Sequence, residues 1–494
     1  MRTLLISAAS LVIGLAGGIW LMKSDSGQSV AKVARERAVE LVVESASLGT
    51  RERIMLEHPE MLAAISRGGS FGGKHSAVIA MDLFTTSGPG IEEAKKLSEI
   101  IEVAPRTWLI RLPIVNAALF ETDDGLVLVD TGMGVGGPAI LDLMRQVSDK
   151  PLHTIIYTHG HVDHAYGTWA LMEAGTPERP IEVIAQDKLP TRFDRYIRMR
   201  GSLANYMSQK LDSLPDSRDD LVYPTRTFSD RLELEIGGET FVLQHREGET
   251  DDQLFVWVPS RKALASADYY QGFLPNAGNG KRMQRNIEEW AFALREMANL
   301  GAEVLLPAHG AEITDPALIS ENLNVLAEAL EFILNHTISG LNAGLRKDQI
   351  ADSVELPEHL ANHPTLRIQY VTPADISKMV MKRYTGWWDD VPSNWTPAPR
   401  EAQGEQIARL AGGIDMLVAE ARGLIETDVV MACHLTDWAF LAAPENPDVQ
   451  QLVIDVYRAR VLDPRSNTME MLNYVKVMTE ARELQLVGNH TASH

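Results

Sequence analysis

The chain has 494 residues, of which 45% are hydrophobic, so it is long enough to form two or three domains with buried cores. Its 67 acidic residues outnumber its 46 basic ones, and the net charge of −21 argues against nucleic acid or an anionic membrane surface as a partner, since both bind to a basic face. The lone cysteine, Cys433, excludes an internal disulfide framework and a metal site built from cysteines.

The first 23 residues form an apolar segment. The twenty residues from Thr3 to Met22 carry no charged side chain, a length that can span a bilayer as a helix and that also suits an export signal. No small-x-small cleavage pattern follows, so an uncleaved anchor is favoured, with a cleaved signal as the alternative. We therefore expect an exported, periplasmic protein that residues 1–23 tether to the inner membrane.

The pattern of apolar residues then changes twice along the chain. Residues 24–75 are interpreted as a connector with some helix. From 76 to 312, strand-like runs alternate with helical patterns, which predicts an α/β domain, and "DDG" at 123–125 predicts a hairpin turn. From 315 to 485, apolar residues recur at helical spacing, so we expect an all-α domain, followed by a disordered tail at 486–494.

One short stretch contains a cluster of candidate metal ligands. "THGHVDHAYG" places three histidines and an aspartate between His159 and His164. The residues before it, "LHTIIYTH", are β-branched and apolar, so the cluster follows a buried strand, where α/β proteins build their sites. Neutral imidazole and carboxylate are the ligands that Zn²⁺ and similar ions prefer. The stretch therefore predicts a metal site rather than an ordinary polar loop.

Five motifs in this order, "LVLVDTG", "THGHVDH", "GETDD", "SAD" and "PAHG", resemble the metallo-β-lactamase superfamily, whose signature is HxHxDH. The third metal position, usually histidine, is Glu249, which resembles the alkyl sulfatase branch. Residues 384–413 independently resemble the start of the alkyl sulfatase dimerisation domain. The resemblance spans residues 76–485 and implies an α/β metallo-β-lactamase fold, an αββα sandwich, followed by an all-α dimerisation domain that forms a homodimer.

The chain departs from that branch in two ways. It stops before a third, sterol-carrier-like domain, which in those sulfatases helps to hold the alkyl chain. The bridging carboxylate is Asp268, as in the wider superfamily, where the branch has glutamate. Both departures concern the substrate more than the fold or the metal.

Two divalent ions about 3.5–4 Å apart need six or seven protein ligands and a shared water. The candidates are His159, His161 and Glu249 for one ion, Asp163, His164 and His309 for the other, and Asp268 as the bridge. We expect two divalent ions, Zn²⁺ first among them, and a water that loses a proton between them near neutral pH. Asp163 and Asp268 are also the candidate catalytic residues.

The resemblance also implies substrate contacts and an activity. Arg285 aligns with an arginine of the branch and Tyr206 with a substrate-pocket tyrosine, so both are candidates for binding an anionic ester. The alternatives are a solvated charge for Arg285 and helix packing for Tyr206. The implied reaction is hydrolysis of alkyl sulfate esters to alcohol and sulfate. Hydrolysis of another ester, lactone or amide, or a membrane-tethered binding module with a structural metal, stays open as an alternative.

Overall fold

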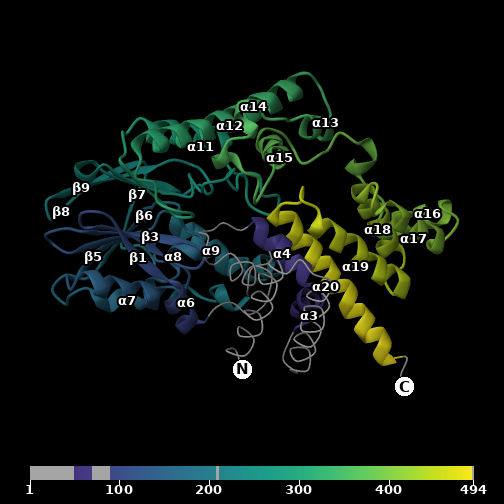
Figure 1. Cartoon of the computed structure of the whole chain (residues 1–494), viewed down its shortest axis with the longest axis horizontal. Helices are drawn as coiled ribbons and strands as arrows, with labels where there is room; N and C mark the ends of the chain where they lie inside the picture. The colour runs from purple at the N-terminus through teal and green to yellow at the C-terminus, as the bar shows by residue number, and fades with distance from the viewer. Residues whose placement is uncertain (1–48, 69–89, 207–210, 492–494) are drawn as a thin grey trace, which may run out of the picture. The chain divides into compact units, whose positions relative to one another are not determined.

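The computed structural model describes residues 49–68, 90–206 and 211–491, which fall into two compact units (Figure 1). One unit holds the described residues from 90 to 395, and the other joins residues 49–68 to residues 396–491. The predicted membrane segment, 1–23, lies outside the described residues. Among the helices that the structure does describe, none combines the length and the apolar character that a membrane span needs.

Two β-sheets form the centre of the unit from 90 to 395. The strands of the seven-stranded sheet follow chain order, whereas the five-stranded sheet has the order β12-β11-β10-β9-β8. The first sheet contains β1 (Glu99–Ala104), β2 (Thr107–Arg111), β3 (Asn116–Glu121), β4 (Leu126–Val129), β5 (Leu152–Ile156), β6 (Glu182–Gln186) and β7 (Arg226–Phe228). The second contains β8 (Arg231–Ile236), β9 (Glu239–His245), β10 (Leu254–Val258), β11 (Ala263–Ala267) and β12 (Val304–Pro307).

The two sheets pack face to face because apolar side chains alternate between the two faces of their strands. In β3, Ala118 and Phe120 belong to the core between the sheets, and Ala117 and Leu119 belong to the core on the opposite face. The turn between β3 and β4 confirms the predicted hairpin. It contains Gly125 at a φ of 143°, where a Cβ would lie 2.7 Å from a carbonyl oxygen.

Helices cover the outer face of each sheet, which confirms the expected αββα sandwich (Figure 1). α7 (Gly137–Val147) packs on the first sheet through Ile140 and Met144. On the other side, Trp290 of α11 (Ile287–Ala298) donates from Nε1 to the carbonyl oxygen of Tyr269 at 3.0 Å. The remaining helices of this unit are α6 (Ile91–Leu97), α8 (Val162–Ala165), α9 (Leu189–Arg198), α10 (Arg200–Asn205), α12 (Pro316–Asn342), α13 (Lys347–Asp352), α14 (Glu358–Ala361) and α15 (Pro373–Tyr384).

The sheet-containing unit is longer than the predicted α/β domain. The sequence analysis places a boundary between residues 312 and 315, whereas the compact unit continues to residue 395. α12 packs along α11, and α15 packs against α12, so these helices belong with the sheets. Spacing of apolar residues identifies a helix but does not say which layer it covers.

The second unit is entirely helical in its described residues. It contains α3 (Thr50–Glu57), α4 (Pro59–Gly68), α16 (Arg400–Leu410), α17 (Ile414–Leu424), α18 (Val429–Ala442), α19 (Pro447–Leu462) and α20 (Thr468–Thr491). Part of the predicted connector is therefore folded, because Ile54 and Met61 are buried in one cluster with Val453 and Val475. α20 continues to Thr491, into the tail predicted at 486–494, since a helix already nucleated gains one backbone hydrogen bond for each residue added.

Candidate metal centre

The predicted ligands follow the carboxyl ends of strands from both sheets. His159 and His161 come just after β5, and the short helix α8 that follows carries the next two ligands. Glu249 lies in the loop after β9, Asp268 directly follows β11, and His309 comes just after β12. β9, β11 and β12 run in the same direction, so their carboxyl ends meet at one edge of the second sheet.

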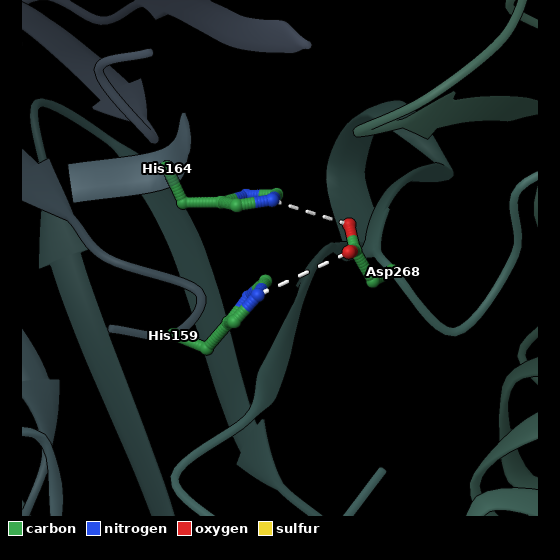
Figure 2. Close-up of side chains that lie close together, drawn as sticks. All are labelled: His159, His164 and Asp268. Atoms are coloured by element: carbon green, nitrogen blue, oxygen red, sulfur yellow. Dashed lines mark ion pairs between the residues drawn. The ribbon is translucent and has the colours of Figure 1, made fainter. Parts of the chain in front are cut away.

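Asp268 lies at the middle of the cluster. Its Oδ1 is 3.4 Å from Nε2 of His164 and also 3.4 Å from Nε2 of His309, and its Oδ2 is 3.9 Å from Nε2 of His159. Figure 2 shows the imidazoles of His159 and His164 pointing at different oxygens of this carboxylate. A carboxylate whose two oxygens face separate ligand groups can bridge two cations.

The other ligands lie around this carboxylate in two groups. In one, Oδ2 of Asp163 is 3.6 Å from Nε2 of His164 and 3.6 Å from Nε2 of His309. In the other, Nδ1 of His161 is 4.0 Å from Oε1 of Glu249. The structure therefore brings together all seven of the predicted ligands: His159, His161, Asp163, His164, Glu249, Asp268 and His309.

Hydrogen bonds outside the cluster orient its imidazoles. Nδ1 of His164 lies 2.8 Å from Oδ2 of Asp130, and Nδ1 of His309 lies 2.8 Å from the carbonyl oxygen of Ile114. Asp130 is itself held by the backbone N–H and hydroxyl of Thr158. These acceptors hold the Nδ1 protons, so each Nε2 points toward the centre, as in metal-binding histidines generally. Burial opposes charging of both rings, but the carboxylate of Asp268 outweighs it and raises the pKa of His309 to about 9 and that of His164 well above its usual value, so a metal that binds here displaces a proton from each.

Two buried atoms of the cluster fit a cation. Nε2 of His164 and Oδ1 of Asp268 make no hydrogen bond within the described part of the chain, and both residues are at most 2% exposed. A buried polar atom without a hydrogen bond is costly unless something compensates it. Imidazole nitrogen and carboxylate oxygen suit a divalent ion such as Zn²⁺, so the residues present fit the metal that the fold implies.

The charge states also suit metal binding. Burial holds the pKa values of His159 and His161 well below their usual range, so both imidazoles are neutral at pH 7. Burial opposes ionisation of Asp268, but the neighbouring His164 outweighs it and keeps the pKa of Asp268 well below its usual value. Burial raises the pKa of Glu249 to about 8, and a cation beside this carboxyl would favour its ionised form.

The centre is partly open to solvent, and only on one side. Among the ligands, Asp163 is 22% exposed and His161 14% exposed, whereas His159 and His164 are fully buried. A small molecule would therefore approach the centre past Asp163 and His161.

Of the two predicted substrate-binding residues, Arg285 reaches the cluster. It is 1% exposed, and its Nη2 lies 2.7 Å from Oε1 of Glu249, while its Nε and Nη1 have no hydrogen-bond partner among the described residues. Tyr206 is 57% exposed, and the ammonium group of Lys281 lies over its ring, 5.6 Å from the ring centre. The structure shows no contact between Tyr206 and the ligands in the part of the chain that it describes.

Sequence reasoning missed residues that support the centre. Gln271 and Asn276 donate side-chain hydrogen bonds to Glu249, and no motif marked either of them. Burial raises the pKa of Tyr370, and the charges of Asp163 and Glu249 raise it further. Tyr370 lies in the stretch that the sequence analysis assigned to the all-α domain, so nothing in its local pattern indicated a place near the metal ligands.

Family comparisons agree with this geometry. Residues 110–309 match the metallo-β-lactamase superfamily, and residues 346–484 match the alkyl sulfatase dimerisation family. The chain combines a metallo-β-lactamase domain with an alkyl sulfatase dimerisation domain. The resemblance stated from the motifs is confirmed, including its alkyl sulfatase branch.

Similar proteins support the same branch. The chain is 29% identical over 349 residues to a linear primary-alkylsulfatase from Pseudomonas, and the match covers 65% of each chain. It is 24% identical over 422 residues to an alkyl/aryl-sulfatase from Saccharomyces cerevisiae, and that match covers 79% of this chain and 63% of the relative. The structure of an inverting sec-alkylsulfatase from Pseudomonas superposes with a TM-score of 0.69 at 21% identity, covering 85% of this chain and 70% of that one, which shows a common fold. The chain spans 58–66% of the length of its curated alkylsulfatase relatives.

Proposed function

We propose that the protein is a dinuclear metal hydrolase that cleaves alkyl sulfate esters, with water, to an alcohol and sulfate. The observation that carries this proposal is the convergence of two ligand groups on the two oxygens of Asp268, beside an arginine with spare donors. The similarity to alkylsulfatases supports the choice of ester.

We keep the division of ligands that the sequence analysis expects: His159, His161 and Glu249 would hold one ion and Asp163, His164 and His309 the other, with Asp268 available to both. The close groups His161, Glu249 and Asp268, and Asp163, His164 and His309, are compatible with it. When bound, ions of this kind acidify a water and polarise the substrate oxygen. Zn²⁺ is the ion that this mixture of imidazoles and carboxylates suits first.

The protein's own groups position the reactants. Oxygens of Asp163 and Asp268 accept hydrogen bonds, so they orient the attacking water within the cluster. The Nε and Nη1 groups of Arg285, which no described residue occupies, donate to the oxygens of the sulfate group, because a guanidinium presents its donors in a planar fork that suits tetrahedral oxyanions. Burial of His159 and His164 keeps bulk water away from the deep side of the centre.

A panel of esters tests this function. Purified protein loaded with Zn²⁺ is assayed with alkyl sulfates, alkyl phosphates, carboxylic esters and lactones of matched chain length. We expect sulfate release from the alkyl sulfates with kcat/KM at least tenfold above that for any other class. Robust turnover of neutral esters or lactones, with none of the sulfates, would replace the proposal by the second candidate, a hydrolase of another ester, lactone or amide.

Two further proposals concern the whole protein. The match of residues 346–484 to a dimerisation family supports a homodimer. The apolar residues 1–23 would tether an exported protein to the inner membrane. Cell fractionation tests the tether: the full chain is expected with the membranes and a version lacking residues 1–24 in the soluble fraction.

A further inference from the structure

Three of the described side chains donate hydrogen bonds to Glu249, which also lies beside the carboxyl group of Asp268. Nη2 of Arg285 lies 2.7 Å from Oε1, Nε2 of Gln271 lies 3.1 Å from Oε2, and Nδ2 of Asn276 lies 3.4 Å from Oε1. Glu249 and Arg285 are both buried, at 7% and 1% exposure. A carboxylate can accept several such bonds at once, because each of its oxygens has two lone pairs.

The imidazoles of the same centre have surroundings of the opposite kind. Nδ1 of His164 lies against a carboxylate, that of Asp130, and Nδ1 of His309 lies against the carbonyl oxygen of Ile114. Both neighbours are acceptors, as a histidine needs when its other nitrogen binds a metal. A histidine at position 249 would instead turn its N–H toward a guanidinium and amide donors, and it would remove the carboxylate that pairs with the buried charge of Arg285.

We propose that Arg285 is a positioning residue. It is the reason why the third ligand of the ion held by His159 and His161 is a carboxylate rather than an imidazole. Its bond to Oε1 holds the carboxylate in place, and its charge offsets the extra negative charge that Glu249 brings to the centre. This inference rests on the proposed metal centre. It is separate from the donation of Nε and Nη1 to a sulfate group, because it acts on metal binding with no substrate present.

The inference predicts a specific pattern of compensation. Arg285→Met removes the cation that orients Glu249, so the affinity for one of the two ions falls on the order of tenfold or more. Glu249→His alone also loses that ion, because its imidazole meets Arg285. In the double variant the buried cation is gone, so the histidine can bind, and the second ion returns with an affinity at least fivefold above that of Glu249→His.

The experiment measures Zn²⁺ stoichiometry by elemental analysis and Zn²⁺ affinity by competition with a chromophoric chelator. Circular dichroism of each metal-free variant checks that it is folded. Arg261→Met is the matched control, because Arg261 forms a similar ion pair, 2.9 Å from Nη2 to Oε1 of Glu239, with no ligand involved. It should keep both ions at wild-type affinity.

The outcomes separate this inference from the proposed function. Wild-type protein that binds no Zn²⁺ would end both. If wild-type protein binds two ions and Arg285→Met binds them equally tightly, only the role of Arg285 is overturned. If Arg285→Met does not fold, the comparison of Glu249→His with the double variant still decides: no gain of metal in the double variant overturns the inference, and a gain supports it.

Discussion

His161 and His245 show how little separates a metal ligand from a structural histidine in this chain. His245 is four residues from Glu249 along the chain, but its Nδ1 lies 2.8 Å from the carbonyl oxygen of Gln253, which ties β9 to β10. His161 is far from Glu249 in sequence, yet its Nδ1 faces that carboxylate at 4.0 Å. The group that each imidazole contacts, rather than its separation from Glu249 along the sequence, distinguishes the candidate ligand from the structural histidine.

His161→Ala should lose one of the two ions and nearly all activity, because the missing ligand also displaces the water that the centre holds. Elemental analysis of the purified variant, next to wild type, checks the loss. His245→Ala is the control and should keep two ions per chain. Active wild-type protein with a single ion per chain would end the dinuclear proposal.

At the scale of the elements, Arg261 joins the two sheets. It follows β10 of the second sheet, and its guanidinium donates to the carbonyl oxygens of Arg106 and Glu121, which border strands of the first sheet. It also donates to the hydroxyl of Thr107 at 3.0 Å and pairs with Glu239 of β9. Since β10 runs antiparallel to β9 and β11, Arg261 lies at the edge of the sheet opposite the ligands, and its bonds join the sheets away from the centre.

Arg261→Met should lower the free energy of unfolding by about 2–4 kcal/mol, since it leaves several acceptors without their charged donor. Burial disfavours ionised Glu239, but hydrogen bonds from Ser260 and Arg261 outweigh this and lower its pKa below 4.5. A lowered pKa in the folded state means that the pair stabilises fully above the unfolded value and loses that contribution as the pH falls. Urea unfolding at pH 7 and near pH 3.5 should therefore show a smaller difference between wild type and variant at the acidic pH, and an equal or larger difference would contradict it.

At the scale of the whole molecule, net charge opposes the proposed substrate. The chain carries −21, so an anionic ester is repelled at long range and depends on the local charge of the metals and Arg285 for capture. Raising the ionic strength screens the long-range repulsion. We expect kcat/KM for alkyl sulfates to rise between 20 and 200 mM salt by about two- to fivefold, while a neutral ester of matched chain length changes little. A fall in kcat/KM for the sulfates would show that the local cationic field dominates.

Self-association is the second property of the whole molecule. α18 is apolar on most of its surface, and Val430 and Met431 remain 45% and 46% exposed in the single chain. Exposed apolar side chains on a helix of a dimerisation family are expected to be covered by a second copy. Sedimentation of the protein without residues 1–24 should give a dimer at micromolar concentration, and Met431→Glu should weaken it. A clean monomer of the unmutated protein would count against the proposed homodimer.

The sequence alone determined which seven residues are the candidate ligands of the centre. His159, His161, Asp163 and His164 are close neighbours in the chain, so a single buried strand before them was enough to predict that they act together. Glu249, Asp268 and His309 each follow a strand of their own, and their motifs occur in a fixed order that indicates one family. The αββα sandwich was predictable only as what the resemblance carried by these motifs implies. The apolar runs by themselves indicated buried strands of an α/β domain.

Only the tertiary structure decided which groups surround those ligands. Arg285 was predicted to bind substrate, but its ion pair with Glu249 joins two loops of the chain, and no spacing rule reports such a contact. Tyr370 and the helices up to residue 395 were assigned to the all-α domain because their local pattern is helical, yet packing of α12 along α11 places them with the sheets. Local patterns record which face of an element is apolar, whereas the partner of that face is chosen by packing across the whole chain.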